Sequence, residues 1–182
     1  QKLIYIMGAG RSGTTALATF LGNNKEVLNI GEMHQFFEYL EVRKECSCGN
    51  LLHECEFWRS KIDYPTQESS KNSRIFSGKM ESHSSILKHI LQLFNKKEIE
   101  EYIEIHQQLL NSIQLGSEKN ILLDSSKYIG RALALDKLEN IDVKVIYVVR
   151  DVRGVINSFS KNVQTSKKPL STIFYYLIIN SV

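Results

Sequence analysis

The chain begins with an order of segments that sharply limits its fold: an apolar run at residues 3–7, a glycine-rich stretch at 8–15 and an apolar helix start at 16–21. A buried strand, a glycine loop and a helix in this order form an anion cradle in α/β proteins. Glycine lets successive backbone N–H groups turn inward, and the helix N-terminus is electropositive. Ser12, Thr14 and Thr15 add hydroxyl donors. We therefore predict an α/β, P-loop-type three-layer fold, with a central parallel sheet flanked by helices.

The loop departs from the Walker A pattern of ATP-binding proteins at one position. Gly8 and Gly13 keep the spacing of that pattern. Thr14 stands where a lysine would reach the β- and γ-phosphates, and Arg11 is the cation of the loop. A ligand with a 5′-phosphate but no β- or γ-phosphate fits this change. The predicted ligand-binding residues of the loop are Gly10, Arg11, Ser12, Gly13, Thr14 and Thr15. The alternative is a glycine turn with a capped helix and no ligand.

A second candidate anion site follows the β-branched run at residues 143–149, which predicts a central parallel strand. Arg150 comes directly after this strand, and Ser158 lies eight residues later in a stretch with helical spacing. Ligands of open α/β sheets bind outside the carboxyl ends of the strands, so this strand end and the glycine loop are expected to face one crevice. Two separated anion sites indicate a nucleotide phosphorylated at two positions. For Arg150, the alternative is a local ion pair with Asp151 and helix capping.

Together, G-x-x-R-S-G-T-T-x-L at residues 8–17 and R-D-x-R-x-x-x-x-S at residues 150–158 resemble the paired motifs of the sulfotransferase family. The resemblance is closest to the carbohydrate and protein-tyrosine branches, which carry arginine in the loop, and to bacterial-type members. It implies 3′-phosphoadenosine 5′-phosphosulfate (PAPS) as donor and adenosine 3′,5′-bisphosphate as product, with no metal required. The first motif would bind the 5′-phosphosulfate, and Arg150 and Ser158 the 3′-phosphate. Val152 departs from the family, which most often has proline there, and we expect it to alter the turn more than the chemistry.

The resemblance also implies the catalytic residues. Glu32 follows a predicted short strand, and a glutamate at this spacing after the loop arginine acts in these branches as the base for the acceptor hydroxyl. Lys127 follows another predicted strand and would bind the leaving oxygen. Arg11 and Ser158 are further candidates for contact with the transferring group. His34 is a rival base, although its aromatic neighbours favour packing. As structural alternatives, Glu32 can favour a helix N-terminus, and Lys127 can belong to a serine-capped helix start.

The remaining sequence predicts a single domain, residues 1–182, truncated at its C-terminus, with a helical and cysteine-containing insertion around residues 43–118. Polar residues at 64–78 indicate a mobile loop or crossing. Two amphipathic helices follow, with apolar stripes along residues 86–94 and 99–113. We expect both stripes to be packing faces.

Three cysteines, Cys46, Cys48 and Cys55, lie close together in this insertion, with His53 nearby. Structural zinc sites use four cysteine or histidine ligands. However, the spacing is not that of a standard zinc ribbon, and the C-x-C pair places neighbouring ligands awkwardly. A disulfide from Cys55 to Cys46 or Cys48 is a second option, and free thiols in a packed insertion are the third. Of these, we predict a metal-free form, so the predicted site contains no metal ligand.

The charge pattern excludes a typical nucleic-acid-binding surface, because the net charge is only +3 and no basic stripe with interleaved aromatic residues is present. The apolar stretch at residues 173–179 is too short to span a membrane and predicts a buried helix. No signal peptide or membrane anchor is visible. We therefore expect a cytoplasmic protein, or a protein of the Golgi lumen if an anchor has been removed.

These observations predict an enzyme, a PAPS-dependent sulfotransferase. It would move a sulfuryl group from PAPS to a hydroxyl of an acceptor by in-line attack, with a carboxylate base. The class of acceptor does not follow from the residues. The alternatives are a P-loop small-molecule kinase with a degenerate phosphate loop, against which Thr14 argues, and a non-catalytic nucleotide-binding protein.

Overall fold

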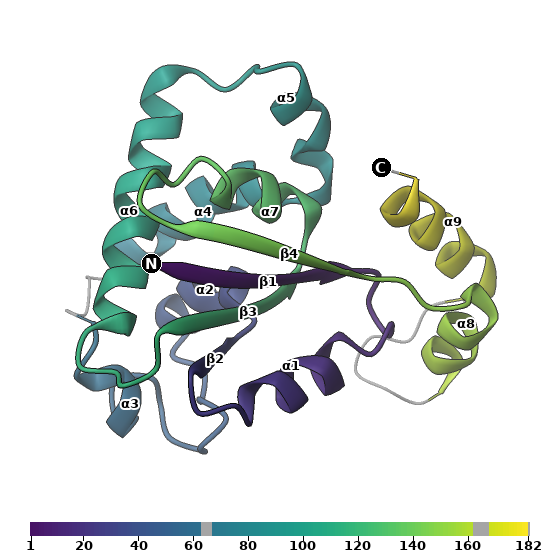
Figure 1. Ribbon diagram of the computed structural model, residues 1–182. Coiled ribbons are helices and arrows are strands. Elements are labelled where there is room, and N and C mark those ends of the chain that lie inside the picture. Colours follow the sequence, from purple (N-terminus) through teal and green to yellow (C-terminus); the bar gives the residue numbers. More distant parts are fainter. Residues whose placement is uncertain (63–66, 162–167, 182) are drawn as a thin grey trace.

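The computed structural model describes residues 1–62, 67–161 and 168–181, in which helices cover both faces of a parallel β-sheet (Figure 1). The strands are β1 (Lys2–Gly8), β2 (Val27–Gly31), β3 (Ile121–Lys127) and β4 (Asp142–Val148), in the order β2-β3-β1-β4 with every pair parallel. Parallel neighbours need long crossover connections, which here contain the helices. The predicted α/β fold with a parallel sheet flanked by helices is confirmed.

Eleven helical elements connect and cover the described strands. The α-helices are α1 (Thr14–Gly22), α2 (Phe36–Glu41), α3 (Glu56–Arg59), α4 (Gln67–Glu81), α5 (Ile86–Ile90), α6 (Lys96–Gln114), α7 (Ile129–Leu135), α8 (Val152–Ser160) and α9 (Pro169–Asn180). Two 3₁₀ turns, η1 (Met33–Gln35) and η2 (His83–Ser85), precede α2 and α5. In Figure 1, α1 lies along one face of the sheet, and α8 and α9 lie beyond the ends of β1 and β4.

The alternation of side chains along β1 places the core on both faces of the sheet. Leu3 and Tyr5 pack in a large cluster with side chains of α2, α6 and α7, whereas Ile6 packs on the opposite face with Ala18 of α1. Successive residues of a strand point to opposite faces. Because helices cover both faces, β1 is a continuous apolar run in the sequence.

The loop expected at the polar residues 64–78 is wrong for most of that range. Residues 67–81 form α4, and residues 64–66 lie outside the described part of the chain. α4 buries the polar side chains of Ser70, Ser77 and Glu81, and Ser77 contacts the ring of His106. A helix that buries paired polar groups shows little hydrophobic periodicity, so its sequence resembles a loop.

The apolar stripe expected along residues 86–94 is also only partly correct. α5 is short, and the side chains of Leu87 and Ile90 are exposed. The helix instead packs through His89, which is buried and whose Nε2 lies 2.7 Å from the carbonyl oxygen of Met80. A hydrogen bond to a buried carbonyl therefore anchors this helix, whereas Leu87 and Ile90 remain exposed.

The helix expected along residues 99–113 is confirmed as part of α6. It begins with a capping box, in which the Asn95 side chain accepts from the Glu98 N–H and the Glu98 side chain accepts from the Asn95 N–H. Leu110 and Ile113 are buried in the large core cluster. The stripe thus packs as the periodicity predicts.

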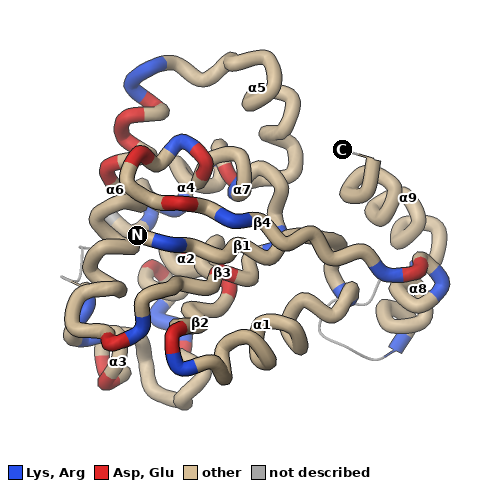
Figure 2. The backbone as a smooth tube through the Cα atoms, in the orientation of Figure 1, with Lys and Arg blue, Asp and Glu red and all other residues tan. Residues whose placement is uncertain are grey.

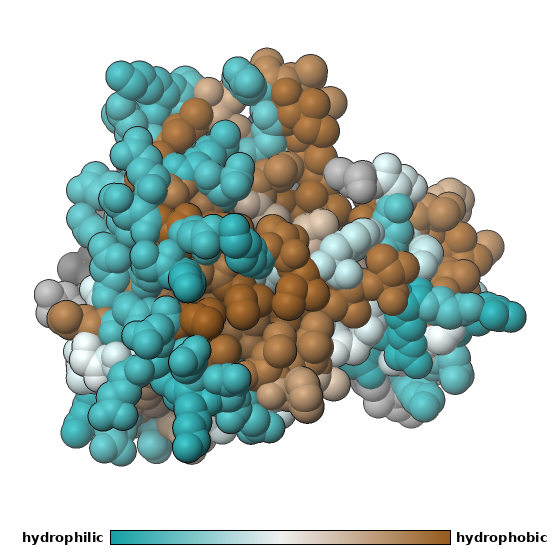
Figure 3. Space-filling view, in the orientation of Figure 1, coloured by the Kyte–Doolittle hydropathy of each residue, from teal (hydrophilic) through white to brown (hydrophobic). Residues whose placement is uncertain are grey.

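Two further elements form as predicted, but they are less buried than predicted. β4 is an edge strand of the described sheet rather than a central one, and Val145 is exposed on it. The helix predicted at 173–179 forms within α9, where Ile179 is buried but Phe174 and Leu177 are exposed. α8 covers one side of α9. Apolar surface over β4, α5 and α9 is visible in Figure 3.

Charge is unevenly distributed among the helices. In Figure 2, basic residues followed by acidic ones lie in the first half of α6, whereas α9 carries neither kind. No helix in the described ranges is both long and apolar enough to cross a membrane.

The core assignment can be tested at Leu122, which is fully buried between the sheet and its helical cover. Leu122→Ala is expected to lower the free energy of unfolding by about 2–5 kcal/mol, because it removes contacts and leaves a cavity. Urea denaturation followed by circular dichroism measures this change. The matched control is Leu87→Ala, at a residue that is 63% exposed, with an expected change within about 0.5 kcal/mol. Similar losses in both variants would contradict the assignment.

Candidate active site

The order of the strands fixes the order of chemical groups along the carboxyl edge of the sheet. Gly8 at the end of β1 is level with Val148 at the end of β4. From β2 to β4, this edge carries Glu32, Lys127, the glycine loop and Arg150. Adjacent strands are about 4.8 Å apart. Glu32 and Arg150 therefore lie on opposite sides of the glycine loop.

These groups line one cavity of about 1160 Å³. It brings together nearly all of the site residues that the sequence predicts: Gly10, Arg11, Gly13, Thr14, Thr15, Glu32, Lys127, Arg150 and Ser158. Ser12 is the exception, because it is buried and does not line the cavity. The wall also contains residues that were not predicted as site residues, among them His83, Tyr128 and Tyr175.

Backbone conformation explains the two glycines that frame the loop. A Cβ at Gly8 would clash with the Val148 carbonyl, so glycine allows β1 and β4 to approach at this point. Gly13 has φ +95°, in the left-handed region that glycine adopts at little cost. Arg11 adopts φ +68° without being glycine. Such strain persists where the surrounding structure holds it, and it is common at ligand-binding sites.

The loop leaves hydrogen-bond donors available for an anion. Helix α1 has its Leu17 N–H bonded to the Gly13 carbonyl at 3.0 Å, and the amides before Leu17 have no intrahelical partner. Within the described residues, the buried Ser12 hydroxyl oxygen has no hydrogen-bond partner. A buried polar atom left unpaired costs about 1–3 kcal/mol. The amides at the start of α1 fit an anionic ligand, which would satisfy them, whereas the Ser12 hydroxyl does not line the cavity.

The second motif lies directly against the first. Arg11 Nε donates to Ser158 Oγ at 2.9 Å, and Arg150 Nη1 donates to the Arg11 carbonyl at 3.0 Å. The Arg150 guanidinium packs over α8 at Gly154, where a Cβ would lie 2.8 Å from its Nε. The glycine loop and the first turns of α8 thus form one surface of the cavity. This confirms the prediction that the two motifs face one crevice.

The alternative proposed for Arg150, a local ion pair with Asp151 and helix capping, is only partly correct. In the described structure Asp151 pairs with Arg153 instead, at 2.7 Å, and its side chain caps α8 by accepting from the Arg153 N–H. Hydrogen bonds from Arg153 lower the pKa of Asp151 to about 2. With its acidic neighbour engaged elsewhere, the Arg150 guanidinium lies at the cavity.

A carboxylate and an ammonium group form the other side of the site. Lys127 Nζ donates to Glu32 Oε1, and Gln35 Nε2 donates to Glu32 Oε2 at 3.3 Å. Both charged side chains are partly exposed at the cavity. Lys127 has φ +75°, a second strained non-glycine position at this site. The pair places a proton acceptor beside a cation that can stabilise developing negative charge.

The rings beside this pair include two histidines. The His34 ring lies 4.4 Å from the Tyr128 ring, and the His83 ring stacks on Tyr128 at 4.5 Å. Burial, with a contribution from the charge of Arg131, lowers the pKa of His34 to about 4. The His34 imidazole is therefore uncharged near neutral pH. His83 and Tyr128 were missed as site residues because a contact between η2 and the end of β3 has no sequence signal.

A buried charge network supports the site from within the fold. Arg131 is fully buried, and its Nε donates to Asp124 Oδ2 at 2.8 Å while its Nη1 donates to Glu81. Asp124 also accepts from the Ser126 N–H at 2.9 Å, and Ser126 Oγ accepts from the His34 N–H at 3.0 Å. A continuous chain of hydrogen bonds thus connects the core to the turn that follows Glu32.

A sequence signal for this network was present. Arg131 interrupts the apolar stretch of α7, and Asp124 directly follows apolar residues of β3. Charged side chains are almost never fully buried unless they are paired. Two opposite charges inside predicted core elements therefore indicate an internal ion pair, although nothing in the sequence identifies Glu81 as the third member.

The fold and the site define an α/β protein in which a glycine loop, a basic helix start and a carboxylate–lysine pair share one cavity. The model of the Sulfotransferase family matches residues 4–178, nearly the whole chain. The chain belongs to this family, and the resemblance of its two motifs is confirmed at that level. A comparison with curated proteins found no match.

The acid sensitivity of the fold provides a test of the site's burial. Since the pKa of His34 falls from 6.5 to about 4 on folding, the neutral form stabilises the protein fully above pH 6.5. This contribution is lost as the pH falls toward 4, and it is about 2 kcal/mol smaller near pH 5 than near pH 7.5. Urea denaturation at both pH values should show a correspondingly smaller loss for His34→Gln than for the unmodified protein. His53→Gln, at an exposed histidine, should not reduce the loss. An undiminished loss in His34→Gln would refute the assignment.

Proposed function

We propose that the chain is a PAPS-dependent sulfotransferase that transfers a sulfuryl group to a hydroxyl of an acceptor. Membership of the sulfotransferase family supports sulfuryl transfer in general. The observation that carries the donor assignment is the contact between the glycine loop and α8, made by Arg11, Ser158 and Arg150. It joins two anion-binding motifs in one cavity.

The residues present fit a nucleotide with phosphates at two positions. The loop amides would hold the 5′-phosphosulfate, and Arg150 with Ser158 would hold the 3′-phosphate. When bound, this donor supplies the activated sulfuryl group. Thr14, in place of the Walker A lysine, argues against a nucleoside triphosphate.

The order of groups along the edge supports an in-line transfer. Glu32 would take the proton of the acceptor hydroxyl as its oxygen forms a bond to sulfur. The bond from sulfur to the 5′-phosphate oxygen would break, with its electron pair remaining on that oxygen. Lys127 and the loop amides would stabilise the resulting charge. Strand order supports this division of roles, because Glu32 and Arg150 lie on opposite sides of the loop.

The surroundings of the two candidate bases favour Glu32. His34 is held by its contact with Tyr128, and burial lowers its pKa to about 4. A histidine of such low pKa has lost the advantage that imidazole normally has as a base near neutral pH. Glu32 is more open, with 32% of its side chain exposed at the cavity.

The base assignment predicts a selective loss of turnover. Glu32→Gln keeps the shape of the side chain but removes the proton acceptor, so kcat should fall by roughly 100- to 10,000-fold. Transfer of labelled sulfate from PAPS in an acceptor screen measures kcat, and calorimetry measures the affinity for adenosine 3′,5′-bisphosphate, which should change little. Glu26→Gln, at the opposite end of β2, is the matched control. Unchanged turnover in Glu32→Gln would remove Glu32 from this role.

The 3′-phosphate assignment predicts a selective loss of affinity. Arg150→Ala should weaken binding of adenosine 3′,5′-bisphosphate by roughly 10- to 100-fold, the usual contribution of a hydrogen bond to a charged group. Binding of AMP, which lacks the 3′-phosphate, should change much less. Arg153→Ala is the control, because the exposed Arg153 pairs with Asp151. Equal losses for both nucleotides would contradict two separate phosphate positions.

A further inference from the structure

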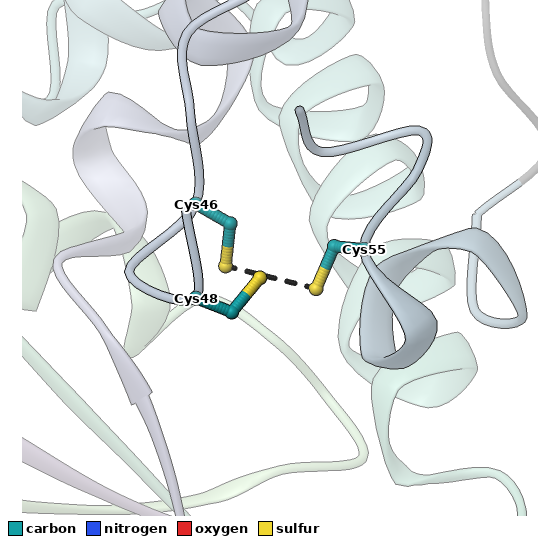
Figure 4. Close-up of side chains that lie close together, drawn as sticks. All are labelled: Cys46, Cys48 and Cys55. Carbon is teal, nitrogen blue, oxygen red and sulfur yellow. Dashed lines mark hydrogen bonds between the residues drawn. The ribbon is translucent and has the colours of Figure 1, made fainter. Parts of the chain in front are cut away.

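The three cysteines of the chain converge at one point, although their spacing in the sequence favoured a metal-free form. Figure 4 shows the thiols of Cys46, Cys48 and Cys55 pointing toward one another. The sulfurs of Cys46 and Cys55 are 3.7 Å apart, and all three sulfurs lie within 4.8 Å of one another. All three cysteines are free thiols. The awkward C-x-C spacing therefore does not separate the sulfurs.

A tight hairpin places the first two thiols on the same side. An antiparallel bridge joins Glu45 to Leu51, and the Cys46 N–H donates to the Asn50 carbonyl at 2.7 Å. Gly49 closes the turn at φ +87°, a left-handed conformation that favours glycine. This backbone curls enough for both cysteines of the C-x-C pair to face a common centre.

The third thiol comes from a part of the chain that is anchored in the core. Cys55 is buried directly before α3, and its N–H donates to the Leu51 carbonyl at 2.8 Å. Leu52 and Trp58, on either side of it, are buried in the large core cluster. The hairpin and the start of α3 are thus held so that the three sulfurs meet.

The arrangement matches tetrahedral metal binding better than a disulfide. Zinc–sulfur bonds are about 2.3 Å long, so two thiolates on one tetrahedral zinc ion are about 3.8 Å apart. The 3.7 Å between Cys46 and Cys55 agrees with this separation. A disulfide would use two of the sulfurs and leave no role for the third. Zinc uses all three, and soft thiolate ligands select it over Mg²⁺ or Ca²⁺.

We propose that Cys46, Cys48 and Cys55 bind a zinc ion, with three thiolates and one water molecule completing a tetrahedron; the site thus differs from structural zinc sites with four cysteine or histidine ligands. Binding of Zn²⁺ displaces the three thiol protons. The exposed position of Cys48 leaves room for the water ligand. His53 lies 3.5 Å from the Glu54 carboxylate through its Nε2 and is not needed as a ligand. This proposal replaces the metal-free form that the sequence spacing favoured.

The metal would brace one wall of the active-site cavity. Cys46 and Ser47 line that cavity together with Leu52 and Trp58. The hairpin that carries them has little regular structure apart from the Glu45–Leu51 bridge. No step of sulfuryl transfer passes through the zinc, so this proposal stands or falls independently of the proposed function.

The test is the zinc content of purified protein, prepared with a reductant and dialysed against metal-free buffer. Mass spectrometry of the element should find one zinc per chain in the unmodified protein. Cys48→Ser should lose it, while circular dichroism shows that the fold persists, because Cys48 is exposed. Ser47→Ala, between the two hairpin cysteines, is the control and should retain its zinc.

Cobalt substitution gives a second, independent readout of thiolate ligation. Protein stripped with a chelator and then loaded with Co²⁺ should develop thiolate-to-cobalt charge-transfer absorption, and Cys48→Ser should weaken it. A chain that retains no zinc on dialysis and shows no such absorption would overturn the proposal. Stoichiometric zinc that survives in Cys48→Ser would overturn it as well, since the metal would then lie elsewhere. An intramolecular disulfide in freshly purified protein would also contradict it.

Discussion

The burial of one guanidinium between two carboxylates is the interaction on which the rest of the structure depends. Arg131 of α7 joins Asp124 of β3 to Glu81 of α4, so it connects the sheet to its helical cover. Burial disfavours the charged forms of Glu81 and Arg131, and the opposite charges of their partners offset that cost. Removing one partner would leave an uncompensated buried charge. The network also extends through Ser126 to the active-site turn.

The strand order of the parallel sheet places the candidate site residues at separate positions along one edge. Each functional group follows a different strand, and the strand order separates the carboxylate–lysine pair from the basic start of α8. The glycine loop lies between them and lines the cavity. In the proposed transfer, this order would place Glu32 on the acceptor side of the loop and Arg150 on the side of the 3′-phosphate.

Sequence predicted the fold class and the meeting of the two motifs, because both depend on local rules: apolar strand runs, glycine at a tight turn and apolar periodicity in α6. It failed where tertiary pairing overrides local pattern. α4 resembled a loop because it buries polar groups such as Ser77 and Glu81. The convergence of three thiols depends on a hairpin held by Gly49. His83 reaches the cavity wall from η2, where its ring stacks on Tyr128.

The central claim is that the glycine loop and α8 together bind a nucleotide phosphorylated at two positions. Calorimetric titration of the unmodified chain with adenosine 3′,5′-bisphosphate, beside AMP and beside ATP without magnesium, tests it most directly. The account predicts that the bisphosphate binds more tightly than either of the others, because only it places an anion at each motif. Tighter binding of ATP, or equal binding of AMP and the bisphosphate, would contradict it.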